Sequence, residues 1–214
     1  MKTLTLTIIT LLISGVVYAG NPKYEKAMEA ALNQLDQCQT ITDFNAVANT
    51  FKRIGDAEKS EWLPLYYQAF SQIIMSFMEQ KDKVKKDAYL DLAESSINKL
   101  LESNPEESEV YALQGFMFTA RLVVDPQTRG QKYMMLSGES VGKALKINPT
   151  NPRALYIQLS NETGAARFFG NDIAPYCDRI NHLLENWEAY NSGAKFYPKW
   201  GKREVEGMAR GCGG

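Results

Sequence analysis

One short phrase occurs twice in this chain, and it constrains the fold more than any other feature. The segment that ends in Asn104-Pro105 returns as the segment that ends in Asn148-Pro149, and a polar turn follows each. Proline lacks a backbone donor and restricts the residue before it, so each copy is typical of a helix that stops before the next begins. The two prolines lie 44 residues apart, within the period range of stacked helical hairpins.

Apolar residues recur three and four positions apart along nearly the whole chain, which indicates helices and not strands. The connections between these patterns are short, so neighbouring helices must run antiparallel. We therefore expect an all-α fold, a right-handed superhelical stack of about four antiparallel hairpins. The expected helices cover 24–38, 43–54, 62–78, a stretch from the charged turn 80–86 to 104, 108–124, 129–147, 152–168, 173–190 and a short piece from 201 to 210.

Two expected helix ends depend on local breakers. Gly55-Asp56 is predicted to stop the second helix, since glycine favours helix C-termini. Asp125-Pro126 is predicted to close the fifth, with a long turn reaching to Gln131 before the sixth.

The first residues have the pattern of an export signal. A lysine at position 2 precedes an apolar stretch over 4–17, and Val17-Tyr18-Ala19 supplies small residues for cleavage after Ala19. The stretch is shorter than the roughly 20 residues that span a bilayer, and no cysteine follows it to make a lipoprotein. We expect a signal peptide over 1–19 and an exported, periplasmic domain over 20–214.

The charge balance excludes one class of partner. The formal net charge is -1 and basic residues form no cluster, whereas nucleic-acid binders need a basic footprint. The length suits one sizeable domain with a continuous core.

The chain has three cysteines, Cys38, Cys177 and Cys212. Export exposes them to oxidising conditions, and an odd count leaves one thiol over. We predict a Cys177–Cys212 disulfide, which would fix the Gly-Cys-Gly-Gly tail to a helix. Cys38 lies on an amphipathic pattern and is predicted to be a small buried hydrophobe.

Around residues 84–160 the chain resembles the tetratricopeptide repeat family. Tyr111, Gly115 and Phe118 match the family's bulky, glycine and aromatic positions on the first helix of a hairpin. The family's second helix carries small and bulky residues before a proline, so that the two helices pack closely. The matching residues are Ser137, Val141, Ala144 and Pro149. In the preceding repeat they are Ala93, Ile97, Leu100 and Pro105.

The resemblance implies a binding surface. First helices of such hairpins line a concave face that binds peptides or protein segments. Aromatic residues and arginine at these positions are typical of interface hot spots, although each aromatic is also a candidate for the core between repeats. The predicted groove residues are Tyr67, Phe70, Phe116, Arg153 and Tyr156.

The C-terminal residues 191–214 are expected to cap the stack. The aromatic cluster Phe196-Tyr197-Pro198-Lys199-Trp200 is interpreted as a hydrophobic lid on the open end, with a ligand platform as the alternative.

Catalysis has little support in the sequence. His182 is the single histidine, and Cys177, five residues earlier on the same predicted helix, points about 140° away from it. One histidine and three scattered cysteines lack the compact spacing of a zinc site, and we expect no cofactor. A cell-envelope hydrolase or lytic transglycosylase using Glu139 stays open as an alternative, as does a self-associating scaffold. We predict a non-catalytic module that binds a protein or peptide.

Overall fold

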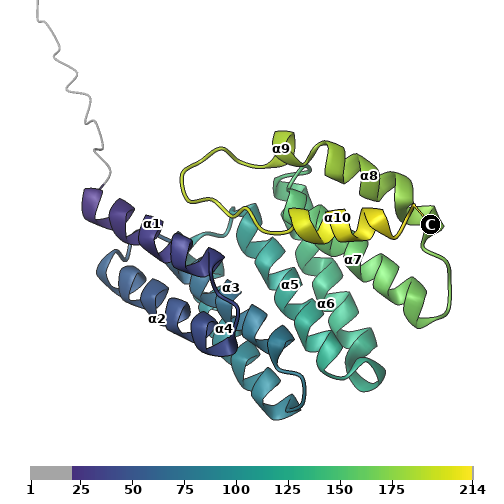
Figure 1. The fold of residues 1–214 in the computed structure, drawn as a ribbon, viewed down its shortest axis with the longest axis horizontal. Helices are drawn as coiled ribbons and strands as arrows, with labels where there is room; N and C mark the ends of the chain where they lie inside the picture. Colours follow the sequence, from purple (N-terminus) through teal and green to yellow (C-terminus); the bar gives the residue numbers. More distant parts are fainter. Residues whose placement is uncertain (1–20, 214) are drawn as a thin grey trace, which may run out of the picture.

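Helices make up the regular structure of residues 21–213, the part of the chain that this computed structural model describes. The all-α prediction is confirmed for these residues, whereas the expected signal peptide, residues 1–19, lies outside them. Figure 1 shows α1–α4 at one end of the molecule and α5–α8 with α10 at the other. The helices are α1 (Pro22–Asp36), α2 (Ile41–Ala57), α3 (Leu63–Met78), α4 (Lys83–Ser103), α5 (Ser108–Val124), α6 (Pro126–Ile147), α7 (Pro152–Phe168), η1 (Ala174–Tyr176), α8 (Cys177–Glu185), α9 (Trp187–Tyr190) and α10 (Lys202–Arg210).

Side-chain caps set several helix starts. The hydroxyl of Thr40 accepts the N–H of Asp43, whose carboxylate accepts the N–H of Thr40 in return, so α2 begins at Ile41. The predicted stop at Gly55-Asp56 is wrong, because both residues continue the helix to Ala57.

The connection between α5 and α6 is much shorter than predicted. The carboxylate of Asp125 accepts the N–H of Thr128, and Pro126 occupies the first helical turn, where its missing donor costs nothing. The predicted start at Arg129 and the long turn are therefore wrong. The single helix expected over 173–190 is instead η1, α8 and α9 in succession.

The helices α5 and α6 approach most closely at Gly115. A Cβ built on this glycine would lie 2.9 Å from Val141 Cγ2 and 3.4 Å from the Ser137 carbonyl oxygen. Ser137, Val141 and Ala144 are all buried against α5. The small residues that suggested a close hairpin therefore do form one.

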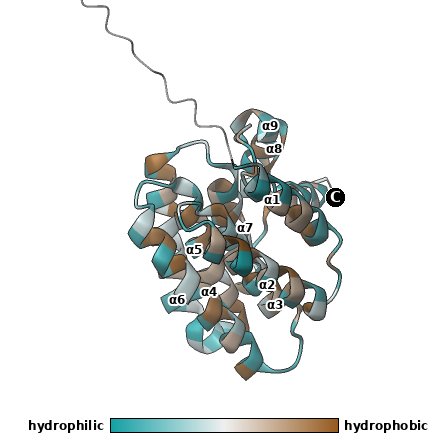
Figure 2. Cartoon of the chain, turned by 90° about the vertical axis from the view of Figure 1, so that its left-hand side faces the viewer, coloured by the Kyte–Doolittle hydropathy of each residue, from teal (hydrophilic) through white to brown (hydrophobic). Residues whose placement is uncertain are grey.

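The apolar faces of the helices meet in two clusters. Figure 2 shows the hydrophobic residues concentrated where helices face one another. The larger cluster runs from α1 to α7, and a smaller one joins α7, α8, α9 and α10 around Trp187, which is 1% exposed. Within residues 21–213, none of the helices has the length and apolar character needed to cross a bilayer.

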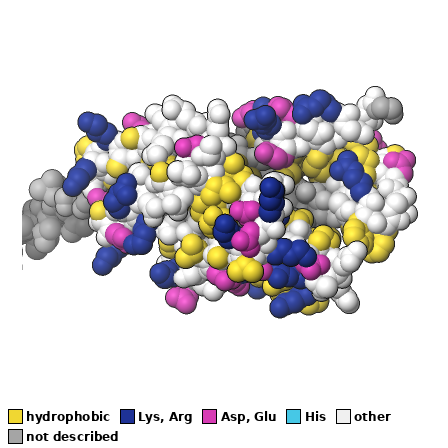
Figure 3. Space-filling view, turned by 60° about the horizontal axis from the view of Figure 1, so that its bottom comes forward, with side chains coloured by type: hydrophobic (Ala, Val, Ile, Leu, Met, Phe, Trp, Pro, Cys, Tyr) yellow, Lys and Arg dark blue, Asp and Glu magenta, His cyan; other side chains and the backbone are white. Residues whose placement is uncertain are grey.

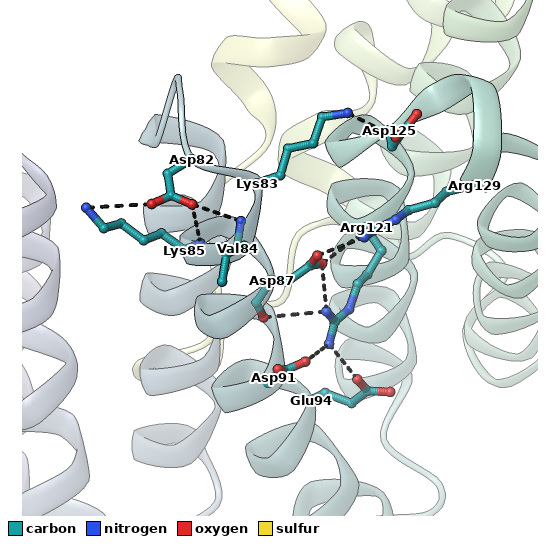
Figure 4. Close-up of polar contacts among 10 residues, drawn as sticks. All are labelled: Asp82, Lys83, Val84, Lys85, Asp87, Asp91, Glu94, Arg121, Asp125 and Arg129. Atoms are coloured by element: carbon teal, nitrogen blue, oxygen red, sulfur yellow. Dashed lines mark hydrogen bonds and ion pairs between the residues drawn. The ribbon is translucent and has the colours of Figure 1, made fainter.

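A network of charged side chains ties α4 to the hairpin of α5 and α6 (Figure 4). Arg129 donates to both carboxylate oxygens of Asp87, each at 2.8 Å. Arg121, largely buried, donates to Asp87 at 3.0 Å and also pairs with Asp91 and Glu94. The hydrogen bonds from Arg129, followed by those from Arg121, hold the pKa of Asp87 below its ordinary value.

We expect Gly115→Ala to lower the free energy of unfolding by about 1–2 kcal/mol, because the added methyl group must displace Val141. The control is Gly142→Ala on α6, where a Cβ meets nothing within 4 Å, and which should raise stability by about 0.5–1 kcal/mol. Urea unfolding followed by circular dichroism measures both. Equal effects of the two substitutions would contradict the close approach.

We expect Asp87→Asn to lower stability at neutral pH by about 1–2 kcal/mol. A depressed pKa stabilises the folded state above the unfolded value, about 3.9, and this contribution disappears as the pH falls through the folded pKa. The wild-type and variant unfolding curves should therefore converge once the pH has fallen below the lowered pKa of Asp87 in the folded state. A difference that persists at that pH would show that Asp87 acts by packing and not by charge.

Candidate functional site

The aromatic residues predicted to line the concave face lie beneath the chain's own C-terminal segment. Tyr67, Phe70 and Phe116 are buried. The Trp200 ring stacks on Phe70 and Phe116 at centroid distances of 5.2 and 4.9 Å, and it meets Tyr156 edge-on at 6.3 Å. The structure thus brings three predicted residues, Phe70, Phe116 and Tyr156, together around a tryptophan of this same chain.

Arg153, the fifth predicted residue, is 1% exposed and pairs with Glu109 on α5. Its Nε and Nη2 donate to the two Glu109 carboxylate oxygens at 2.6 and 2.7 Å, and Nη1 donates to Asn191 at 2.8 Å. Burial raises the pKa of Glu109, although Arg153 opposes this shift. A binding role for Arg153 and the four aromatics stays a prediction.

The segment between α9 and α10 is fixed to α3 and to Glu107, the residue before α5, by hydrogen bonds. Tyr67 Oη donates to the Phe196 carbonyl at 2.8 Å, Trp200 Nε1 donates to Tyr66 Oη at 2.9 Å, and Tyr197 Oη donates to Glu107 at 2.8 Å. Figure 1 shows this segment reaching across the molecule toward α1. A hollow of about 1090 Å³ remains between the segment, α1 and α3.

The predicted Cys177–Cys212 disulfide is confirmed, and it joins the start of α8 to a cysteine two residues beyond the end of α10. Cys38 was predicted to be a buried residue of the first helix, but it lies two residues beyond the end of α1 as a half-buried free thiol that packs against the larger apolar cluster.

A second concave feature, unconnected with the predicted residues, runs between α6 and α7. We call it the α6–α7 groove. It consists of two adjoining hollows of about 710 and 680 Å³ that share the wall residues Met134, Asn161, Ala165 and Phe169. We call the first its apolar half, because all its lining side chains are uncharged: Thr119, Leu122, Val123, Pro126, Gln127, Gly130, Gln131, Met134, Ser160, Asn161, Gly164, Ala165, Phe168 and Phe169.

Glycines keep this groove open. Gly130, Gly138 and Gly142 lie on one face of α6 with Met134, at spacings of four or eight residues, and Gly164 lies on α7. A Cβ built on any of these four glycines meets nothing within 4 Å. Each glycine costs a helix about 1 kcal/mol relative to alanine, and no close packing requires it here. The glycines therefore leave bare backbone along the walls of the groove.

The polar atoms of the groove floor are satisfied by one another. Asn161 Nδ2 donates to Ser137 Oγ at 2.8 Å, and Thr119 Oγ1 donates to Asn161 Oδ1 at 2.9 Å. Ser137 Oγ also donates to the Gly115 carbonyl at 2.9 Å. This network fixes the floor, and it presents no charge to a ligand.

Large apolar side chains stand exposed at the mouth of the apolar half. Phe168 is 60% exposed, Phe169 74% and Val123 41%. Figure 3 shows the face that lies at the bottom of Figure 1, where hydrophobic side chains are exposed among charged and polar ones. Apolar surface gathered around a cleft is typical of a ligand or partner site.

The candidates for catalysis lie apart from one another. Glu139 is exposed on α6 and lines none of the described hollows. Cys177 is held in its disulfide, whereas His182 is exposed beside Tyr190. Among residues 21–213, no three His, Cys, Asp or Glu side chains are grouped as metal ligands would be.

The sequence did not lead to the α6–α7 groove, because the predicted binding residues were aromatic side chains and an arginine on the first helix of each hairpin. Gly138 and Gly142 have no side chain and fall outside such a pattern. Their shared face with Gly130 and Met134 was a usable signal, since glycines without a packing role leave space along a helix.

Comparison with known proteins gives one strong structural match. No family model matches the chain, and no curated protein matches it by sequence. The solved structure of the HusA haemophore from Porphyromonas gingivalis is similar, with a TM-score of 0.77 and 27% identity, covering 89% of this chain and 92% of that one. A haemophore is a binding protein, so the likeness agrees with a non-catalytic binding role.

We expect Arg153→Met to lower the free energy of unfolding by about 3 kcal/mol or more, because it leaves the Glu109 carboxylate buried without its partner. Arg179→Met is the control: Arg179 pairs with Glu162 but is 47% exposed, and such surface pairs contribute about 0–1 kcal/mol. Chemical unfolding compares them. An Arg153→Met variant as stable as the wild type would show that the fold does not require Arg153, which would then be available for binding.

Proposed function

We propose that this protein is a non-catalytic binding protein whose α6–α7 groove holds a porphyrin-class ligand such as haem. The observation that carries the proposal is the uncharged apolar half of the groove, with exposed phenylalanines at its mouth. The likeness to a haemophore along most of both chains supports the ligand class.

The shape and chemistry of the groove suit a flat, largely apolar ring. Its apolar half, about 710 Å³, lies within the usual range of roughly 300–1,000 Å³ for small-molecule sites. The bare backbone at Gly130 and Gly164 allows a planar ligand to approach both helices closely. The Phe168 and Phe169 rings can stack on or edge against a macrocycle. A ligand's carboxylates would stay at the open mouth, in water, because burying them without a partner is costly.

The expected export and architecture complete this proposal. A signal peptide over 1–19 would bring the domain to the periplasm or beyond, and the helices would form a tetratricopeptide-like stack. A peptide or protein partner at the concave face is a second candidate function, favoured by the hollow of about 1090 Å³ that Tyr67 and Phe70 help to line.

The test is a titration of the chain with metal-free protoporphyrin, followed by absorbance and calorimetry. Gly164→Leu adds a side chain to the groove wall at a position where a Cβ meets nothing within 4 Å. It should weaken binding about tenfold or more while the helical content stays unchanged. The control is Gly207→Leu on α10, which does not line the groove, and which should bind as the wild type does. Failure of the wild-type chain to bind, or equal binding by Gly164→Leu, would refute the proposal.

A further inference from the structure

A hollow of about 400 Å³ lies between α2, α3 and the C-terminal end of α4. Phe51 and Leu100, both fully buried, give it an apolar floor, and the half-buried Trp62 and Leu65 form part of its wall. It shares no lining residue with the α6–α7 groove. Apart from Gly55, the rest of its lining is polar and includes three lysines.

The three lysines come from separate elements and surround one carboxylate. Lys52 lies on α2, Lys59 in the turn between α2 and α3, and Lys99 on α4. Lys52 Nζ donates to Asp56 Oδ2 at 2.7 Å. This hydrogen bond, with the charges of the three lysines in addition, holds the pKa of Asp56 below its ordinary value. The tertiary fold therefore places three ammonium groups around one hollow.

Two of these ammonium groups have no partner of opposite charge. Lys59 and Lys99 form no ion pair within residues 21–213. Glu61, the second carboxylate of the lining, lies close enough to Tyr24 of α1 to add to the effect of burial and raise the pKa of that phenol. Three lysines against two carboxylates leave the hollow with an excess of positive charge, which a bound anion would neutralise.

The uncharged polar side chains of the hollow suit hydroxyl groups. The amides of Gln68 and Asn104 can both donate and accept hydrogen bonds. Trp62 packs edge-on against Tyr66 and Tyr197, at centroid distances of 5.7 and 5.6 Å, and these contacts fix its ring. An aromatic ring beside hydrogen-bonding groups offers an apolar surface to the C–H face of a sugar. A wholly apolar ligand would instead leave the polar groups without partners, which is costly.

Gly55 leaves room in this hollow. It lies inside α2, where glycine is less favourable than alanine. A Cβ built on it would make only an ordinary contact, 3.5 Å from Pro64 Cβ. Helix packing therefore does not require glycine here, and the missing side chain enlarges the space between the helices.

We propose that this hollow binds a monosaccharide that carries an anionic group, either a phosphate or a carboxylate. Lys59 and Lys99 pair with the anion through charge-assisted hydrogen bonds, and Trp62 packs against the sugar ring. The volume of about 400 Å³ is at the small end of the range for ligand sites, roughly 300–1,000 Å³, which suits one sugar ring. The inference is independent of the proposed function, because the two sites share no residue.

The experiment is a calorimetric titration of the chain with glucose 6-phosphate and with glucuronate, beside glucose and inorganic phosphate. The wild type should bind both anionic sugars, and it should bind glucose and inorganic phosphate about tenfold more weakly or less, since each offers only part of the chemistry. The affinity for the anionic sugars should fall as the salt concentration rises. The intrinsic fluorescence should change on binding in the wild type but not in Trp62→Phe.

A double variant, Lys59→Gln with Lys99→Gln, should lower the affinity for glucose 6-phosphate about tenfold or more. The matched control is Lys26→Gln with Lys146→Gln, which removes the same charge from exposed lysines that line none of the described hollows. Both double variants should keep the wild-type helical content, measured by circular dichroism, because all four side chains are exposed. Three results would each overturn the inference: no binding of either anionic sugar, an equal loss in both double variants, or inorganic phosphate bound as tightly as glucose 6-phosphate.

Discussion

The close approach of α5 and α6 at Gly115 is the contact on which the rest of the structure depends. Glycine permits this approach, since a Cβ there would lie 2.9 Å from Val141 Cγ2. Because α6 directs Ser137 and Val141 at α5, its glycine face turns toward α7. Tight packing on one side of α6 and missing side chains on the other together produce the α6–α7 groove.

The C-terminal segment decides which concave surface is open. Trp200 completes an aromatic stack with Phe70 and Phe116, and three hydrogen bonds hold the segment in place. Burial of large aromatic rings is strongly stabilising, so this part of the concave face belongs to the core. The accessible apolar surface is found instead at Phe168 and Phe169.

Helix α7 presents different side chains to two hollows. One of its faces contributes Gly164 and Phe168 to a groove half without charge, where shape and apolar area would select a ligand. Leu155 and Leu159 back a hollow that contains a phenol and an imidazole.

The sequence by itself determined the helical class, the two Asn-Pro stops, the close hairpin at Gly115 and the Cys177–Cys212 pairing, because periodicity, proline chemistry, residue size and redox setting are local properties. It misjudged Asp125-Pro126, since the same dipeptide that ends one helix can cap and start another. Only the tertiary structure decided that Trp200 covers the predicted concave residues and that the glycines of α6 face open space. Both depend on contacts between residues far apart in the chain, and no local pattern specifies which helix faces another or what fills the space between them.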